Sequence, residues 1–139
     1  MRTLAPTDVT VGDALPPLDV PITATLIVSG AIASRDFQDV HHDATLARQR
    51  GAGDIFMNIL TTNGLVGRYV TDWAGPEAIL RKVAIRLGSP NYPGDVMRLT
   101  GTVERVDGNE VEVAIRGTTA LGEHVSGTVA LTLPGKDRA

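Results

Sequence analysis

Cysteine is absent from this chain of 139 residues. Its absence excludes a disulfide framework, a thiolate nucleophile and any zinc site that uses cysteine ligands. Aromatic residues make up only 4% of the chain, and 13 Lys and Arg face 16 Asp and Glu, for a formal net charge of -3. With no basic run and few rings to stack on bases, we expect no nucleic-acid partner.

Long hydrophobic runs are also missing. No segment approaches the roughly 20 apolar residues of a membrane helix, and residues 1–17 lack the apolar stretch of a secretory signal. We therefore expect a cytoplasmic protein without a membrane anchor. The length and a composition of 42% hydrophobic and 21% charged residues predict one globular domain over residues 1–139, with an extended lead-in over 1–20 and a flexible tail over 135–139.

The longest apolar segment covers residues 55–73 and predicts a helix. Asp54 before it suits an N-cap, and Gly75-Pro76 after it cannot continue a helix. Apolar side chains cover most of the circumference, so we expect this helix, at least over residues 55–70, to be buried. Shorter helices are expected near residues 28–34 and, capped by Asp43, over residues 44–49.

After the helix the hydrophobic period changes to two. Alternation over residues 82–87, 110–117 and 125–133 is typical of half-buried antiparallel strands. Asp107-Gly108 predicts a hairpin between strands 96–106 and 110–117, and Gly122-Glu123 predicts the next turn. Residues 4–21 read as an extended segment ending in an edge strand. A long buried helix followed by an antiparallel meander is an α+β layout with the sheet wrapped around the helix, the hot-dog fold.

Candidate chemistry lies in the polar segment before the long helix, where Asp36 and His41 stand five residues apart. If both side chains turn inward, a carboxylate and an imidazole can hold one water molecule between them. Histidine transfers protons near neutral pH, which suits acid–base catalysis. On the spacing alone, a turn-capping aspartate beside a partly exposed histidine is the commoner arrangement.

This segment resembles the motif of MaoC-like (R)-specific hydratases, S-G-D-x-N-P-hydrophobic-H-x-D. Residues 34–43 read S-R-D-F-Q-D-V-H-H-D. The motif's first Asp, its His and its last Asp match Asp36, His41 and Asp43. The motif's Gly, Asn and Pro are replaced here by Arg35, Gln38 and Asp39.

Three longer segments resemble the small subunits of actinobacterial steroid side-chain hydratases: R-D-F-Q-D-V-H-H-D at 35–43, D-I-F-M-N-I-L-T at 54–61 and R-Y-V-T-D-W-A-G-P at 68–76. The resemblance implies a heterodimer or heterotetramer in which this chain carries the catalytic pair and a second hot-dog subunit lacks it. It also implies an acyl-CoA substrate, a cholesterol-derived steroid with a shortened side chain, and no separate cofactor, since CoA is part of the substrate.

The resemblance further implies site residues. Asp36 and His41 would activate water for addition to a 2-enoyl-CoA. The backbone N–H of Ile59, where the family has glycine, would stabilise the enolate oxygen near the start of the helix. Asn58 and Thr62 are polar residues in an apolar segment; they either contact substrate or only bond to nearby backbone.

Two other histidines carry weaker signals. His42 and Asp43 adjoin His41, but adjacent side chains diverge and no fourth ligand is evident, so we expect no metal and a solvated His42. His124 shares the polar side of the last strand with Ser126 and Thr128, which predicts a surface position.

Two other functions remain open at this stage. Hot-dog thioesterases commonly place a carboxylate on the central helix, but no Asp or Glu occurs between residues 55 and 71, and Asp72 lies at the helix end. The second alternative is a non-catalytic hot-dog subunit that stabilises a catalytic partner. Such a subunit has no chemical need for both Asp36 and His41.

Overall fold

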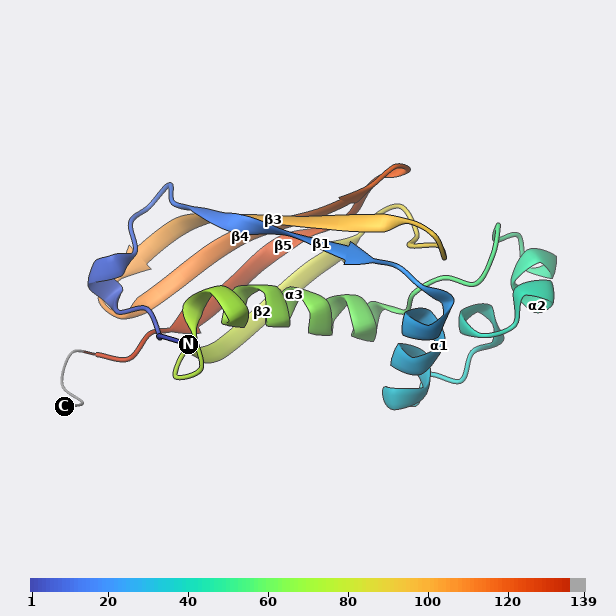
Figure 1. Cartoon of the computed structure of the whole chain (residues 1–139), viewed down its shortest axis with the longest axis horizontal. Helices are drawn as coiled ribbons and strands as arrows, with labels where there is room; N and C mark the ends of the chain where they lie inside the picture. The colour runs from blue at the N-terminus through green and yellow to red at the C-terminus, as the bar shows by residue number, and fades with distance from the viewer. Residues whose placement is uncertain (136–139) are drawn as a thin grey trace.

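The computed structural model describes residues 1–135, so the predicted tail lies outside the described residues except for Gly135 (Figure 1). In chain order the elements are a 3₁₀ helix Pro6–Asp8, β1 Ala14–Pro21, α1 Ala24–Ala33, a 3₁₀ helix Asp39–His41, α2 Ala44–Gln49, α3 Ile59–Ala74, β2 Ile79–Leu87, β3 Val96–Asp107, β4 Glu110–Thr119 and β5 Gly122–Thr132.

The five strands form one antiparallel sheet in the order β1-β3-β4-β5-β2. The sheet curves over α3, while α1 and α2 lie beyond the N-terminal end of that helix (Figure 1). Buried side chains of α3 pack against alternate residues of the strands, including Val66, Val70, Leu99, Val113 and Val129, all with no exposed surface. The predicted hot-dog fold is confirmed.

The long helix begins four residues later than predicted. Residues 55–58 lie outside any helix or strand, and Asn58 rather than Asp54 caps α3. The amide of Phe56 donates to the Val40 carbonyl, and the amide of Met57 donates to the Asn91 carbonyl. Because flanking loops satisfy these backbone groups, the segment has no need of helical hydrogen bonds.

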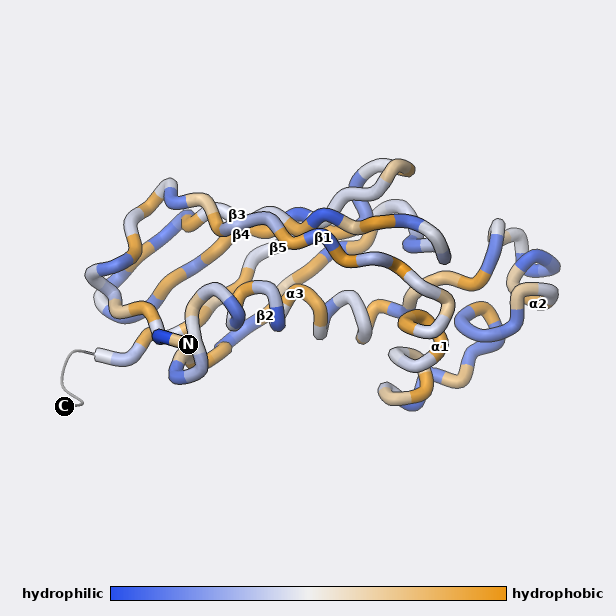
Figure 2. Tube along the Cα trace, viewed as in Figure 1, coloured by the Kyte–Doolittle hydropathy of each residue, from blue (hydrophilic) through white to orange (hydrophobic). Residues whose placement is uncertain are grey.

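After its first two residues, α3 is buried or half-buried on most sides. Ile59 and Leu60 are 50% and 52% exposed, and the other exposed residues, Gly64, Arg68 and Asp72, continue from Leu60 along one stripe of the helix. The prediction of burial on most sides is therefore confirmed except at the first turn. Hydrophobic residues run along the strands and α1 (Figure 2).

The other predicted elements need smaller corrections. The first helix begins at Ala24, where Thr23 caps it, rather than near residue 28. The second matches its predicted bounds and is capped by Asp43. The hairpin after β3 is confirmed, with Asp107 opposite Glu110. The turn after β4 falls at residues 120–121, and Gly122 already begins β5.

The backbones of β2 and β5 approach so closely at Gly127 that the position requires glycine. A Cβ added there would lie 2.0 Å from the Ala84 carbonyl oxygen, so alanine must separate the two strands. We expect Gly127→Ala to lower the free energy of unfolding by about 3 kcal/mol, measured by thermal denaturation. Gly64→Ala is the matched control, because Gly64 lies in α3 with open space around it, and it should stabilise by up to about 1 kcal/mol. Equal melting temperatures for Gly127→Ala and Gly64→Ala would contradict the close contact of β2 with β5 at Gly127.

Candidate active site

His41 is held in one orientation by the segment that precedes α3. Its Nδ1 lies 2.7 Å from the Phe56 carbonyl oxygen, which can only accept, so Nδ1 carries a proton. The Phe56 ring packs edge-on against the imidazole, with ring centroids 5.1 Å apart. His41 is buried. In the neutral ring Nε2 therefore presents a lone pair.

Asp36 is brought back towards His41 by a sharp reversal after α1. Arg35 adopts a φ of 56°, a left-handed conformation that glycine takes without strain, and glycine is the residue of the hydratase motif at this place. The Asp36 amide then donates to the Ala31 carbonyl. Arg35 therefore adopts a backbone conformation that a glycine would take at this place without strain.

The two predicted catalytic side chains meet. Asp36 Oδ2 lies 3.2 Å from His41 Nε2. A carboxylate and a neutral Nε2 both accept hydrogen bonds, so they bond directly only when they share a proton. A water molecule, with two O–H groups, can donate one to each. The pair therefore provides two converging acceptors for one water.

Asn58 connects this pair to the start of α3. Its Oδ1 accepts from the Thr61 amide at 3.0 Å, which caps the helix. Its Nδ2 donates to Ser34 Oγ at 2.9 Å and to Asp36 Oδ2 at 3.2 Å. Both ends of the amide are thus bonded within the protein, and the predicted contact of Asn58 with substrate stays a prediction.

The amide of Ile59 opens α3 at the floor of the same site. The first amide of a helix has no carbonyl four residues earlier within the helix, so it is free of helical bonding. The amide of Thr61 is taken by Asn58 Oδ1, and that of Thr62 by the Asn58 carbonyl. Ile59 therefore has an amide available for a ligand, at the positive end of the helix dipole.

These groups line one pocket of about 350 Å³. Its near wall is the Asp36–His41 loop, and its far wall is the segment after β2 together with His124. The lining residues are Asp36, Gln38, Val40, His41, Phe56, Met57, Asn58, Ile59, Leu87, Gly88, Pro90 and His124. The pocket thus contains both the Asp36–His41 pair and the N-terminus of α3, and its remaining walls are largely apolar.

Comparison with known proteins gives the family. No protein-family model matches the chain. Over 123 residues the chain is 49% identical to the 3-oxo-4,17-pregnadiene-20-carboxyl-CoA hydratase beta subunit of Mycobacterium tuberculosis, covering 88% of this chain and 95% of that protein. This chain belongs to the family of that hydratase subunit. The resemblance noted in the sequence is therefore confirmed.

Solved structures agree with this membership. A chain of the ChsH1-ChsH2 complex from Mycobacterium tuberculosis has a TM-score of 0.88 and 48% identity, covering 90% of this chain and 98% of that one. The R-hydratase PhaJ1 from Pseudomonas aeruginosa also reaches a TM-score of 0.88, with 20% identity over 96% of this chain and 88% of its own. At that identity the second match speaks for the fold alone.

His124 was predicted at the surface, and this prediction is wrong. The residue is 1% exposed and lines the pocket of this hydratase-family chain. The pairing of β4 with β5 shifts between Gly117, opposite Val125, and Thr118, opposite Glu123. His124 is thus the extra residue of a bulge, which breaks the alternation that the sequence pattern assumed.

Both ring nitrogens of His124 have partners. Nδ1 lies 2.6 Å from the Ser89 carbonyl oxygen and donates to it, and Nε2 accepts from the Thr62 hydroxyl at 2.9 Å. Burial lowers the pKa of His124, although the hydrogen bond to Ser89 acts in the opposite direction. Thr62 is fully buried and is not among the residues that line the pocket, and its predicted contact with substrate stays a prediction.

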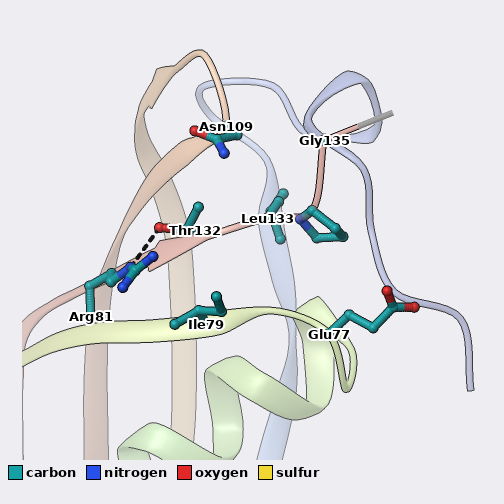
Figure 3. Close-up of a pocket in the computed structure, with 8 residues that line it drawn as sticks. Glu77, Ile79, Arg81, Asn109, Thr132, Leu133 and Gly135 are labelled. Atoms are coloured by element: carbon teal, nitrogen blue, oxygen red, sulfur yellow. Dashed lines mark hydrogen bonds between the residues drawn. The ribbon is translucent and has the colours of Figure 1, made fainter. Parts of the chain in front are cut away.

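A larger hollow of about 590 Å³ lies at the opposite end of the sheet, between the start of β2 and the end of β5 (Figure 3). Arg81 donates to the Thr132 hydroxyl there. Its lining residues include no histidine, so this hollow lacks the acid–base pair of the smaller pocket.

Over residues 1–135, no three His, Asp or Glu side chains are grouped to hold a metal ion. No helix in the described part of the chain is long and hydrophobic enough to cross a bilayer.

Proposed function

We propose that this chain is the catalytic subunit of a heteromeric enoyl-CoA hydratase acting on steroid side-chain thioesters. The observation that carries the proposal is the Asp36–His41 pair. The Phe56 carbonyl accepts a hydrogen bond from His41 Nδ1 and so fixes the proton there. His41 Nε2 and the Asp36 carboxylate are left as two acceptors 3.2 Å apart on the pocket wall. The substrate class comes from the name of the related beta subunit, a 3-oxo-4,17-pregnadiene-20-carboxyl-CoA hydratase.

In the proposed reaction one water molecule donates hydrogen bonds to Asp36 and to His41 Nε2. As its oxygen forms a bond to the β carbon of the enoyl thioester, one O–H bond breaks and the proton passes to the pair. The π electrons move towards the thioester oxygen as an enolate. A proton from the pair then forms the C–H bond at the α carbon, which restores both groups and yields the 3-hydroxyacyl-CoA.

The enolate oxygen needs a donor that is in place before the reaction. The Ile59 amide supplies one at the start of α3, because it lines the pocket and has no helical acceptor. The capping bond from Asn58 holds this first turn, and the second amide hydrogen of Asn58 holds Asp36. Donor and acid–base pair are thus positioned by a single side chain.

A second hot-dog subunit would complete the pocket. In the chain alone a hollow of about 350 Å³ is too small and open to cover a CoA thioester. Apolar side chains remain exposed on α1, on the loop that carries Asp36 and His41 (the catalytic loop) and on the first turn of α3, namely Ile32, Phe37, Ile59 and Leu60. Large exposed apolar side chains beside a site are typical of a subunit interface. The match to a chain of the ChsH1-ChsH2 complex supports the same arrangement.

We expect the chain to co-purify with a second hot-dog subunit when it is expressed with its genomic neighbours. Hydration of 3-oxo-4,17-pregnadiene-20-carboxyl-CoA should be at least about 10²-fold faster for the assembled pair than for the chain alone, because the chain alone leaves the thioester uncovered. The loss of enoyl thioester absorbance measures the rate. Equal rates for the isolated chain and the assembly would overturn the heteromer.

The thioesterase alternative finds no support in the central helix. Asp72 is the only carboxylate of α3, and it pairs with Arg68 at 3.3 Å on an exposed surface. It lies near the end of the helix remote from His41. Free CoA, detected with a thiol reagent, should therefore not accumulate during turnover.

A further inference from the structure

The His124 side chain joins three parts of the chain. It stands at the bulge of β5 and donates from Nδ1 to the Ser89 carbonyl, in the segment after β2. Through Nε2 it accepts from Thr62, in the first turn of α3. The far wall of the pocket and the helix N-terminus at its floor are therefore connected through one imidazole.

The backbone strengthens this connection on the β2 side. The Gly88 amide donates to the His124 carbonyl at 2.7 Å, and the Ser89 amide donates to the Glu123 carbonyl at 2.9 Å. A Cβ at Gly88 would lie 2.4 Å from the Glu123 oxygen, so only glycine permits this approach. Residues 88–89 are thus bonded to residues 123–124 through both backbone and imidazole, which leaves little freedom in the far wall.

Thr62 lies three residues after Ile59, in the same first turn of α3. Asn58 fixes this turn from the side of the catalytic loop. The Thr62–His124 bond fixes it from the side of the sheet. The amide of Ile59 is therefore held between two anchors on opposite sides.

We propose that His124 is a positioning residue of the hydratase site, which sets the first turn of α3, and with it the Ile59 amide, relative to the far wall of the pocket. The proposal rests on the proposed hydratase function. A direct proton-transfer role does not fit, because both ring nitrogens are bonded within the protein and the side chain is 1% exposed. Burial lowers the pKa of His124 and so favours the neutral ring, whose Nε2 can accept from Thr62.

Two variants remove the same hydrogen bond from its two ends. Thr62→Val keeps the shape of the side chain and removes the hydroxyl. His124→Asn keeps an amide N–H at the same number of bonds from the backbone as Nδ1, so the Ser89 bond can persist, but it cannot reach Thr62. Each should lower kcat of the assembled complex by about tenfold with KM within about twofold, because donor placement affects the transition state more than binding.

Rescue and coupling separate positioning from general loss of structure. Thr62→Ser retains the hydroxyl and should restore kcat to within about twofold. The double variant should be no slower than the slower single one, because both lose one shared bond. Val111→Ala is the stability control: Val111 is buried beside Leu131, at the end of the sheet remote from His124. Val111→Ala should lower the melting temperature by at least as much as Thr62→Val or His124→Asn does, and it should leave kcat near that of the unmodified complex.

The assay uses the assembled complex and 3-oxo-4,17-pregnadiene-20-carboxyl-CoA. Normal kcat in Thr62→Val overturns the positioning role, as does an equal loss in Val111→Ala. If His124→Asn does not assemble, the comparison of Thr62→Val with Thr62→Ser decides the question. An unmodified complex that does not hydrate the substrate would instead overturn the proposed function, so the two failures are distinct.

Discussion

Asp36→Asn and His41→Ala should each lower the rate of enoyl-CoA hydration by about 10²-fold or more, the usual effect of losing a positioned acid or base. Asparagine keeps the shape of the carboxylate and can still bond to Asn58, but it cannot take up a proton. Alanine at His41 removes Nε2, which faces Asp36 at 3.2 Å. The measurement is the loss of enoyl thioester absorbance with the assembled complex at saturating substrate.

Because both groups bind the same water in the proposed reaction, the double variant should be little slower than either single variant. His42→Ala is the control, since His42 is exposed and does not line the pocket; it should retain nearly full activity. Near-normal rates in Asp36→Asn would mean that this subunit only supports a catalytic partner. A collapse in His42→Ala alone would mean that His42 rather than His41 takes part in the reaction.

Ile59→Pro should abolish most activity while leaving α3 intact. Proline is favoured at the first position of a helix, where its missing N–H has no helical acceptor. The preceding residue must be extended, and Asn58 already has φ -78° and ψ 160°. The substitution therefore removes one amide donor from the pocket with little strain. We expect kcat to fall by about 10²-fold or more, the scale for one oxyanion donor.

Ile59→Ala is the matched control for the side chain. It keeps the amide and removes only a side chain that is 50% exposed in the chain alone, so kcat should fall by no more than a fewfold. Circular dichroism and assembly with the partner subunit show whether each variant is folded. Comparable losses in the proline and alanine variants would contradict the role of the amide, because the side chain alone would then account for the effect.

Local patterns in the sequence were sufficient for most of the fold. The apolar segment ending at Gly75-Pro76, the alternation of the later strands and the hairpin at Asp107-Gly108 each depend on near neighbours, and each has its counterpart in the structure. Asp36 and His41 were found through the spacing of a known motif. The structure brings them within 3.2 Å of each other, and their catalytic role stays a prediction.

The remaining features depend on residues far apart in the chain. Asn58 ends a non-helical segment because Val40 and Asn91 satisfy the backbone before it, and the side-chain amide of Asn58 donates to Ser34 and Asp36. Nothing in the apolar pattern of residues 55–73 distinguishes Asn58 from Asp54 as the cap. The start of α3, and hence the place of its free amide, was therefore decided by tertiary contacts.

The position of His124 also depends on residues distant in the chain, and the sequence pattern did not predict it. Alternation along β5 predicted a surface residue, but one extra residue in the pairing with β4 turns the imidazole to the buried side. A bulge depends on the register between two strands, which a single strand does not encode. The sequence by itself determined the fold and pointed to Asp36 and His41 as the candidate pair, because these rest on periodicity and on a contiguous motif. Only the tertiary structure decided which polar groups surround that pair, because their partners lie 22 to 62 residues away.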